Sequence, residues 1–377
     1  FKQTPKRIKN SLIIKNYNKG INAIVSAIVA MSNNDDKELI FQSKKIENYL
    51  NKNPISLILK AESARKAKKN ELAEKYFNEM LKNQQTKIIG LRGLLEQNLR
   101  KQDYHHALVY AEDIYNINPK LEWIYKTIRT IIIKTKNWQK LIEIDKDAFN
   151  RNIITKKIQL DNSSIAKYEI ALIKEDFSIH EAIKLLTEAN LSRPNFPPIV
   201  KKLSRLLINH NQLTKAKKLI QKCWVKNPHQ MFFEELMFIS KIENSSIIKI
   251  ISKLIKDNSN NYDSIILIVK ANINEKKWDR AKELIKPLLS SKPNKTICEL
   301  MYQIEMGIYN NTQKANSWKS RIPLGDLEKT WVCKYSGSVQ DNWTGISDEG
   351  FFDSLEWTWP RNEELNKKDN LIPNIIG

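Results

Sequence analysis

The chain has 377 residues, few Gly and Pro (9 and 12), 41% hydrophobic residues and a formal net charge of +21. This composition fits an all-helical body, and the lack of any run of about 18 apolar residues excludes a membrane-spanning helix within the chain. Three cysteines without disulfide or CxxC spacing suit a reducing compartment. The charge favours nucleic acid or an acidic membrane as a partner, or follows from a Lys-, Ile- and Asn-rich composition typical of A/T-biased coding sequence.

The first 19 residues form a basic lead-in without an acidic side chain. Such a run beside a bilayer binds anionic lipid and marks the cytoplasmic side, so we predict contact of residues 1–19 with an anionic membrane surface. A solvated, poorly ordered end is the alternative. Because the chain begins at Phe1 and not at Met, we also expect sequence upstream of it. The basic residues of this segment are Lys2, Lys6, Arg7, Lys9, Lys15 and Lys19.

The segment 103–119, DYHHALVYAEDIYNINP, has the pattern of the second helix of a tetratricopeptide (TPR) unit. Ala107, Ala111 and Ile114 fall on one helical face, and Pro119 ends the segment. The pattern recurs at steps of 34 residues, apart from one step of 41 and one of 31, which gives about nine units. The small-residue positions are Leu39, Ala73, Ala107, Leu141, Ala182, Ala216, Ile250, Ala281 and Ala315.

This repeat predicts an all-α fold, a TPR superhelix (α-solenoid), in which small residues let the two helices of each unit approach closely and stability comes from stacked neighbours. We expect an N-terminal array over 20–160, whose first hairpin begins at Gly20, and a C-terminal array over 161–322. The long step is explained by an insertion at 150–164, whose sequence Asp161-Asn162-Ser163-Ser164 predicts a hinge between the arrays.

The first helix of each TPR unit commonly lines a groove, and counting back from each small-residue position selects mostly Lys and Arg there. We therefore predict a basic groove that binds acidic protein segments or a C-terminal carboxylate. The alternative is that 63 basic residues place several on any helix face. Nucleic acid is a weaker candidate because exposed aromatics are not interleaved with the basic residues. The predicted groove residues are Arg65, Lys66, Arg92, Arg100, Lys126, Lys167, Lys201, Arg205 and Lys270.

The chain shows no Gly-rich phosphate loop, no HExxH and no GxSxG, so we expect no catalytic residues, no cofactor and no metal site. The five histidines fall near predicted turns and are expected to be exposed; adjacent His105 and His106 could ligate haem iron but point to different helix faces. Cys223 and Cys298 are predicted small core residues. Glu234-Glu235 is predicted as surface charge. The other histidines are His180, His210 and His229.

Residues 325–360 form a separate Trp-rich module, followed by a polar tail over 361–377. The segments Cys333-Lys-Tyr-Ser336-Gly337 and Ser347-Asp-Glu-Gly350 have the outline of a zinc-ribbon knuckle pair that retains one cysteine. Because Ser and Gly are not zinc ligands, we expect a degenerate ribbon without zinc and with an apolar core. The predicted core residues of the module are Trp331, Trp343, Phe352 and Trp357.

A basic lead-in, a TPR array and a module with Trp331-Val-Cys333, Trp343 and Phe352-Asp-Ser-Leu-Glu-Trp357 together resemble the alphaproteobacterial HemY-type proteins. The resemblance covers essentially the whole chain. It implies two transmembrane helices upstream of Phe1, a repeat domain on the cytoplasmic side of the bacterial inner membrane, and a scaffold associated with late haem-biosynthesis enzymes. A lipopolysaccharide-assembly TPR adaptor has a similar layout, and a soluble RNA-binding helical-repeat protein is the other alternative.

Overall fold

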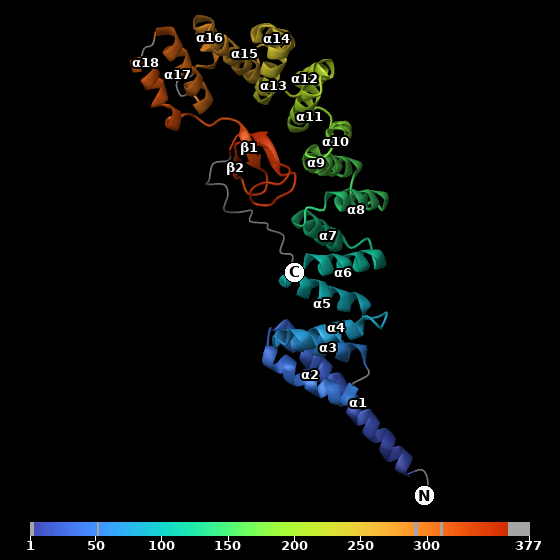
Figure 1. The fold of residues 1–377 in the computed structure, drawn as a ribbon. Coiled ribbons are helices and arrows are strands. Elements are labelled where there is room, and N and C mark those ends of the chain that lie inside the picture. Colours follow the sequence, from blue (N-terminus) through green and yellow to red (C-terminus); the bar gives the residue numbers. More distant parts are fainter. Residues whose placement is uncertain (1–3, 51–52, 290–292, 310–311, 361–377) are drawn as a thin grey trace. The chain divides into compact units, whose positions relative to one another are not determined.

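The computed structural model describes residues 4–50, 53–289, 293–309 and 312–360 (Figure 1). Contacts divide the chain into two compact units, which are described separately here. Unit 1 runs to Lys136 and takes in 150–153, and unit 2 comprises 137–149 and the chain from Ile154 through the Trp-rich module. The predicted tail at 361–377 lies outside the described residues.

Unit 1 consists of helices, and successive helices pack against each other as antiparallel hairpins. The predicted lead-in is helical: a single helix continues from it into the first hairpin, so a hairpin start at Gly20 is wrong. A Cβ at Gly20 would lie 2.5 Å from the Leu50 side chain at the end of the second helix. The glycine therefore lets the first helix pass close to the second at this point. The helices are α1 (Thr4–Ser32), α2 (Asp36–Leu50), α3 (Pro54–Lys66), α4 (Asn70–Met80), α5 (Lys87–Arg100), α6 (Tyr104–Ile117) and α7 (Glu122–Lys134).

The backbone conformation of the turns inside the hairpins of unit 1 repeats every 34 residues. Asn34, Lys68 and Gln102 all have positive φ, at 55°, 58° and 58°. Around the second of these, the Lys68 N–H donates to the Arg65 carbonyl and the Lys69 N–H to the Ala64 carbonyl. This is the Schellman arrangement, which satisfies the last carbonyls of one helix and reverses the chain toward the next.

Unit 2 continues the helical hairpins, with short 3-10 turns between some of them. Its elements are α8 (Trp138–Asn150), α9 (Lys156–Glu175), α10 (Ile179–Ser192), α11 (Pro197–Asn209), α12 (Leu213–Lys226), η1 (Gln230–Phe232), α13 (Phe233–Ile242), α14 (Ile247–Leu254), η2 (Lys256–Asn258), α15 (Tyr262–Asn274), α16 (Trp278–Ile285), η3 (Lys286–Leu288), α17 (Lys295–Tyr309), α18 (Thr312–Lys319) and η4 (Ile322–Leu324).

The eighteen α-helices of the described residues confirm the all-α repeat fold. The predicted small-residue positions are buried, with Ala107, Ala182 and Ala281 fully so. One position is wrong: Ile250 is only partly buried, and Ile247 and Ile251 take the core places at 3% and 0% exposure. The short step of 31 residues therefore falls between Ala216 and Ile247, one unit earlier than predicted, and the next step is the ordinary 34.

The predicted hinge at 150–164 is also wrong, because residues 156–175 form the single helix α9. Three of the four polar residues that suggest a turn, Asn162, Ser163 and Ser164, are buried, and two of them are hydrogen-bonded to neighbouring helices. Asn162 Nδ2 donates to Asp145 Oδ2 of α8 at 2.7 Å, and Ser164 Oγ donates to the Ala189 carbonyl of α10 at 2.9 Å. Polar side chains with such partners do not compete with the helix backbone. The division into compact units falls near residue 137 and not at 160.

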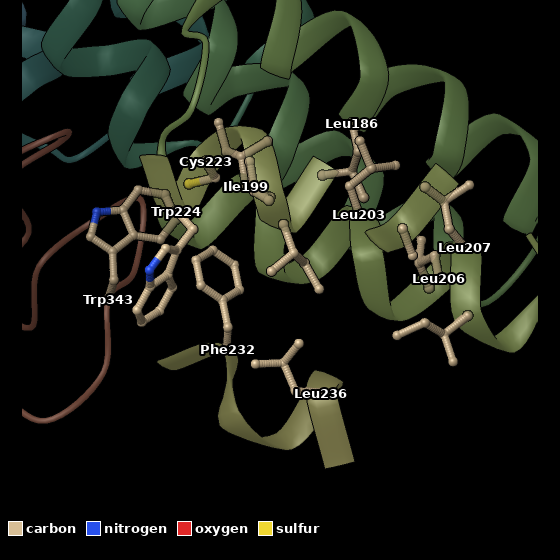
Figure 2. Close-up of a cluster of buried hydrophobic side chains, with 14 of the residues drawn as sticks. Leu186, Ile199, Leu203, Leu206, Leu207, Cys223, Trp224, Phe232, Leu236 and Trp343 are labelled. Carbon is tan, nitrogen blue, oxygen red and sulfur yellow. The ribbon is translucent and has the colours of Figure 1, made fainter. Parts of the chain in front are cut away.

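The Trp-rich module folds as a three-stranded antiparallel sheet in the order β2-β1-β3. Its strands are β1 (Thr330–Cys333), β2 (Val339–Gln340) and β3 (Leu355–Thr358), and Trp331 pairs with both Gln340 and Trp357. The module shares the buried cluster of the repeats: Figure 2 shows Trp343 together with Trp224 and Phe232 of unit 2. Its likeness to a degenerate zinc ribbon stays a prediction.

None of the described helices is both long enough and apolar enough to cross a membrane.

Candidate functional site

Most predicted groove residues in unit 1 form ion pairs. Their partners are carboxylates on the same helix or on a neighbouring one, so the charge there is largely balanced. An exposed pair of this kind adds little to stability, yet it weakens the attraction for an outside anion. The pairs are Arg65 with Glu62 (2.5 Å), Lys66 with Asp36 (3.2 Å), Arg92 with Glu96 (2.9 Å) and Lys126 with Glu122 (2.7 Å).

The predicted groove residues of unit 2 are also engaged. Lys167 pairs with Glu188 at 2.9 Å, Lys201 lies 3.4 Å from Glu234, and Lys270 Nζ donates to Gln230 at 2.8 Å. Burial lowers the pKa of Lys270 by more than its acidic neighbours raise it. These basic residues therefore already have polar or charged partners within the chain, and their place in a binding groove stays a prediction.

Arg205 holds a buried carboxylate and not an exposed groove position. Its guanidinium contacts Glu235 Oε1 through Nε and Nη2 at 3.1 and 2.8 Å and lies 4.1 Å above the ring of Phe238. Glu235 is fully buried, so its prediction as surface charge is wrong; burial raises the pKa of its carboxyl despite the hydrogen bonds from Arg205. This pair has a structural role, because removing Arg205 would leave the Glu235 carboxylate buried without its charged partner, whereas Arg205 also contacts the exposed Glu234 at 3.3 Å.

The Trp-rich module occupies one side of the unit 2 repeats. Trp343 makes edge contacts with Tyr168 of α9 and Phe196 before α11, with ring centroids 5.1 and 5.2 Å apart. Asp353 accepts a hydrogen bond from Arg193 at 2.8 Å. The fit is close, since a Cβ at Gly345 would lie only 2.3 Å from Glu169 Oε1, much nearer than van der Waals contact. The predicted core residues of the module thus pack outward onto the repeats, and Phe352 stacks on Trp138 of α8.

His229 packs against two indoles of the module, which also contact each other, and corrects the prediction that all five histidines are exposed. Its ring centroid is 4.2 Å from that of Trp357 and 5.6 Å from that of Trp331, and its side chain is 4% exposed. Burial, followed by the charges of Lys201 and Lys270, lowers the pKa of the imidazole to about 4. The ring is therefore neutral near pH 7, and its Nδ1 accepts a hydrogen bond from the Met231 N–H.

The single cysteine of the knuckle outline, Cys333, is buried in the module. Burial alone would raise the pKa of its thiol, but hydrogen bonds from Ser336 and Ser354 and from nearby backbone N–H groups lower it overall. The Gly337 N–H donates to the Cys333 carbonyl at 2.8 Å, which closes the turn after β1 through a backbone hydrogen bond. Within the described ranges, no three His, Cys, Asp or Glu side chains gather closely enough to hold a metal ion.

Two hollows lie on unit 1, and Arg100 at the end of α5 lines both. The first, of about 180 Å³, is bounded by α3, α4 and α5, and the second, of about 200 Å³, by α5, α6 and α7. Arg100 is exposed, and no carboxylate in the described part of the chain pairs with its guanidinium. It is therefore the predicted groove residue best placed to meet an outside anion.

The first hollow has the more polar lining of the two. Gln97 Nε2 donates to the Asn70 carbonyl at 2.9 Å, which leaves Gln97 Oε1 buried with no hydrogen-bond donor among the described residues. Phe77 forms part of the lining, and it fits because a Cβ on Gly93 would lie 2.3 Å from its ring. Arg65, paired with Glu62, and Lys101, paired with Glu74 at 3.1 Å, complete a lining with three cations.

The second hollow is more apolar. Leu99, Tyr104 and Ile131 line it together with two threonines, and Lys134 Nζ lies 5.6 Å above the ring of Tyr104. Glu96 borders both hollows but already pairs with Arg92. An extended chain crossing α5 at Arg100 would therefore meet a basic polar hollow on one side and a partly apolar hollow on the other.

Sequence reasoning missed most of this lining. The counting rule that selects Lys126 from Leu141 also reaches Lys134, so that residue could have been found. Asn70, Gln97 and Tyr104 carry no such signal, because their roles depend on how neighbouring helices meet. The structure brings Arg65 and Arg100 to one hollow and does not bring the other predicted groove residues there.

No protein-family model and no curated protein matches this chain. Among solved structures, it is similar to Naa15/Naa10 bound to HypK-THB at 13% identity and a TM-score of 0.46, covering 83% of this chain and 51% of that one. It is also similar to the TPR2AB domain of yeast Sti1 in a pHSP90 complex (13% identity, TM-score 0.32, 83% and 99% covered). A third is a TPR protein from Parabacteroides merdae (11%, 0.33, 81% and 98%).

The chain thus spans about half the length of the first of these structures. At such identities the likenesses concern the fold alone. The repeated hairpins, the Schellman turns 34 residues apart and the buried small-residue positions define the chain as a TPR-type helical-repeat protein.

Proposed function

We propose that this chain is a non-enzymatic scaffold and that unit 1 binds an acidic segment of a protein partner at Arg100. The observation that carries the proposal is the position of Arg100 between two hollows without a carboxylate partner in the described chain. A guanidinium presents paired N–H donors that match a carboxylate, and such charge-assisted hydrogen bonds are about twice as strong as neutral ones.

The surroundings of Arg100 fit an extended peptide. Gln97 Oε1 is a buried acceptor that can receive a backbone N–H, and the hollow around Tyr104 and Ile131 can receive an apolar side chain. Unit 2 is a poorer candidate, because the chain's own module already packs onto its repeats, for example at Trp138 and His229. Unit 1 is thus where a partner segment has room.

The resemblance to HemY-type proteins supports a finer proposal: the scaffold works at the bacterial inner membrane with haem-biosynthesis enzymes as partners, and residues 1–19 face anionic lipid. The segment with six basic and no acidic residues and the FDSLEW segment support it. Tagged protein purified from cross-linked cells should retain haem-pathway enzymes after nuclease treatment. Lipopolysaccharide enzymes, or ribosomal proteins lost on nuclease treatment, would contradict this assignment.

The site itself is tested with Arg100→Glu. We expect binding of fluorescent hexapeptides rich in Asp, Glu and Leu to weaken by about 10- to 100-fold, the loss of one hydrogen-bonded charge pair. Lys87→Glu is the matched control, since Lys87 is exposed at the other end of α5 and changes the net charge equally. Fluorescence anisotropy gives both affinities. Equal affinities for wild type and Arg100→Glu would place the binding site elsewhere.

A further inference from the structure

Helix α1 is apolar on two faces, and unit 1 covers one of them. Ala23, Ile24, Ala27 and Ala30 pack into a cluster with α2 and α3. The second face exposes a row of large apolar side chains, which we call the α1 row: Ile14 (61% exposed), Tyr17 (53%), Ile21 (36%), Val25 (56%) and Ile28 (50%). Large apolar faces are normally covered, and no described residue of the chain covers this one.

The spacing of the α1 row is symmetric about its centre. Counted from Ile21, the other members lie four and seven residues away in both directions. If a second α1 lies antiparallel across a two-fold axis at Ile21, then Ile14 meets Ile28 of the copy, Tyr17 meets Val25, and Ile21 meets itself. The row extends over about 21 Å, and every pairing along it is apolar. We propose that the α1 row docks a second copy of this chain in this antiparallel arrangement.

The charges of α1 agree with a second copy as the occupant. At about 100° per residue, Lys15 and Lys19 lie on the half of the helix opposite the row, and the uncharged Asn18 and Asn22 flank it. No like charges are therefore forced together at the contact. Each chain still carries a net charge of +21, which repels the copy at longer range. Salt screens this repulsion, so dimerisation through the row should strengthen as salt is added.

An anionic lipid surface is the competing occupant of the α1 row, and it has the opposite salt dependence. Attraction between basic residues and acidic lipid falls as salt rises. Lys15 and Lys19 lie on the side of α1 opposite the α1 row, so contact of these lysines with lipid does not require the row. The two occupants are distinguished by salt and by variants in the row.

The first test measures the mass of the 377-residue chain by sedimentation at about 0.05 M and about 0.5 M NaCl. We expect a reversible dimer whose fraction rises with salt. Ile21→Asn should remain monomeric at both salt concentrations, whereas Leu12→Asn should behave as wild type, because Leu12 is 56% exposed on the opposite side of α1. A wild-type monomer throughout, with anionic-vesicle binding that Ile21→Asn abolishes, would assign the row to lipid and overturn the proposal.

A second test addresses the register. Ile14→Glu and Ile28→Lys should each weaken the dimer by at least about tenfold, because each places a charge against an apolar side chain. The chain with both substitutions should dimerise again, since the antiparallel pairing sets the two opposite charges against each other. In a parallel pairing each would meet its own copy and the double variant would stay monomeric, which would contradict the arrangement.

Cross-linking provides a third measurement, because a disulfide between two copies traps even a short-lived dimer. Ile21→Cys should form an intermolecular disulfide under mild oxidation, and Leu12→Cys should not. The three native cysteines are buried and contribute little background. Equal cross-linking of both variants would overturn the proposed contact.

Discussion

At the scale of single residues, the packing of the module on the repeats depends on the protonation state of His229. The ring is neutral in the fold because burial against Trp331 and Trp357 lowers its pKa from the ordinary value of 6.5 to about 4. The unfolded chain therefore binds one more proton between about pH 4 and 6.5, and stability rises with pH across that window. The full effect is on the order of 3 kcal/mol, from about 1.36 kcal/mol for each pKa unit.

We expect His229→Phe to flatten this pH dependence, because an aromatic ring then fills the same place without titrating. The measurement is the unfolding temperature followed by Trp fluorescence from pH 4 to pH 7. His210→Phe, at an exposed histidine, should keep the wild-type slope. A wild-type profile unchanged by His229→Phe would show that another group causes the acid sensitivity.

At the scale of elements, the turns inside the hairpins hold non-glycine residues in a left-handed conformation that favours glycine. Lys68 has φ of 58°, and Lys69 beside it has φ of −89°. We expect Lys68→Gly to stabilise unit 1 by about 0.5 to 1 kcal/mol, since removing the Cβ relieves the left-handed strain. Lys69→Gly should destabilise it, because only the entropy of the unfolded chain increases there. Urea unfolding measures both, and a loss of stability in Lys68→Gly would contradict the turn geometry.

Also at this scale, the helices were predictable because period and packing are linked. A small residue at Ala107 and its equivalents is needed wherever two helices approach closely, so the 34-residue period reports the fold directly. The repeat arithmetic places Ile250 at a small-residue position, but Ile247 three residues earlier also fits the pattern, and only packing decides between them. The Asp161–Ser164 segment has turn-like composition, but Asp145 and Ala189 supply the partners that let it stay helical.

The candidate site was less predictable than the fold. The basic residues at Arg65 and Arg100 follow from the repeat register. Carboxylates three or four residues away on the same helix, such as Glu62 for Arg65, could have been found from the helical spacing. Carboxylates on a neighbouring helix, such as Glu235 for Arg205, could not, because register alone does not show that they are close. The burial of His229 depends on a module about 100 residues further along the chain, so no local pattern indicates it.

At the scale of the whole molecule, the division into two compact units means that a substitution that destabilises one unit should leave the stability of the other unchanged. Trp343, 7% exposed between Tyr168 and Phe196, is the side chain that most directly tests this. Trp343→Ala should destabilise unit 2 by about 3 kcal/mol, the usual cost of removing a large buried aromatic side chain.

Hydrogen exchange should then show the loss. Amides of α9, α11 and η1 should lose protection in Trp343→Ala because their cover from the module is weakened, while α3 to α6 should exchange as in wild type. Trp359→Ala is the matched control, since that indole is 53% exposed, and it should change neither unit. If α3 to α6 lost protection together with α9 and α11, the repeats would unfold as one cooperative body, and binding at Arg100 could then be tuned by the module from a distance.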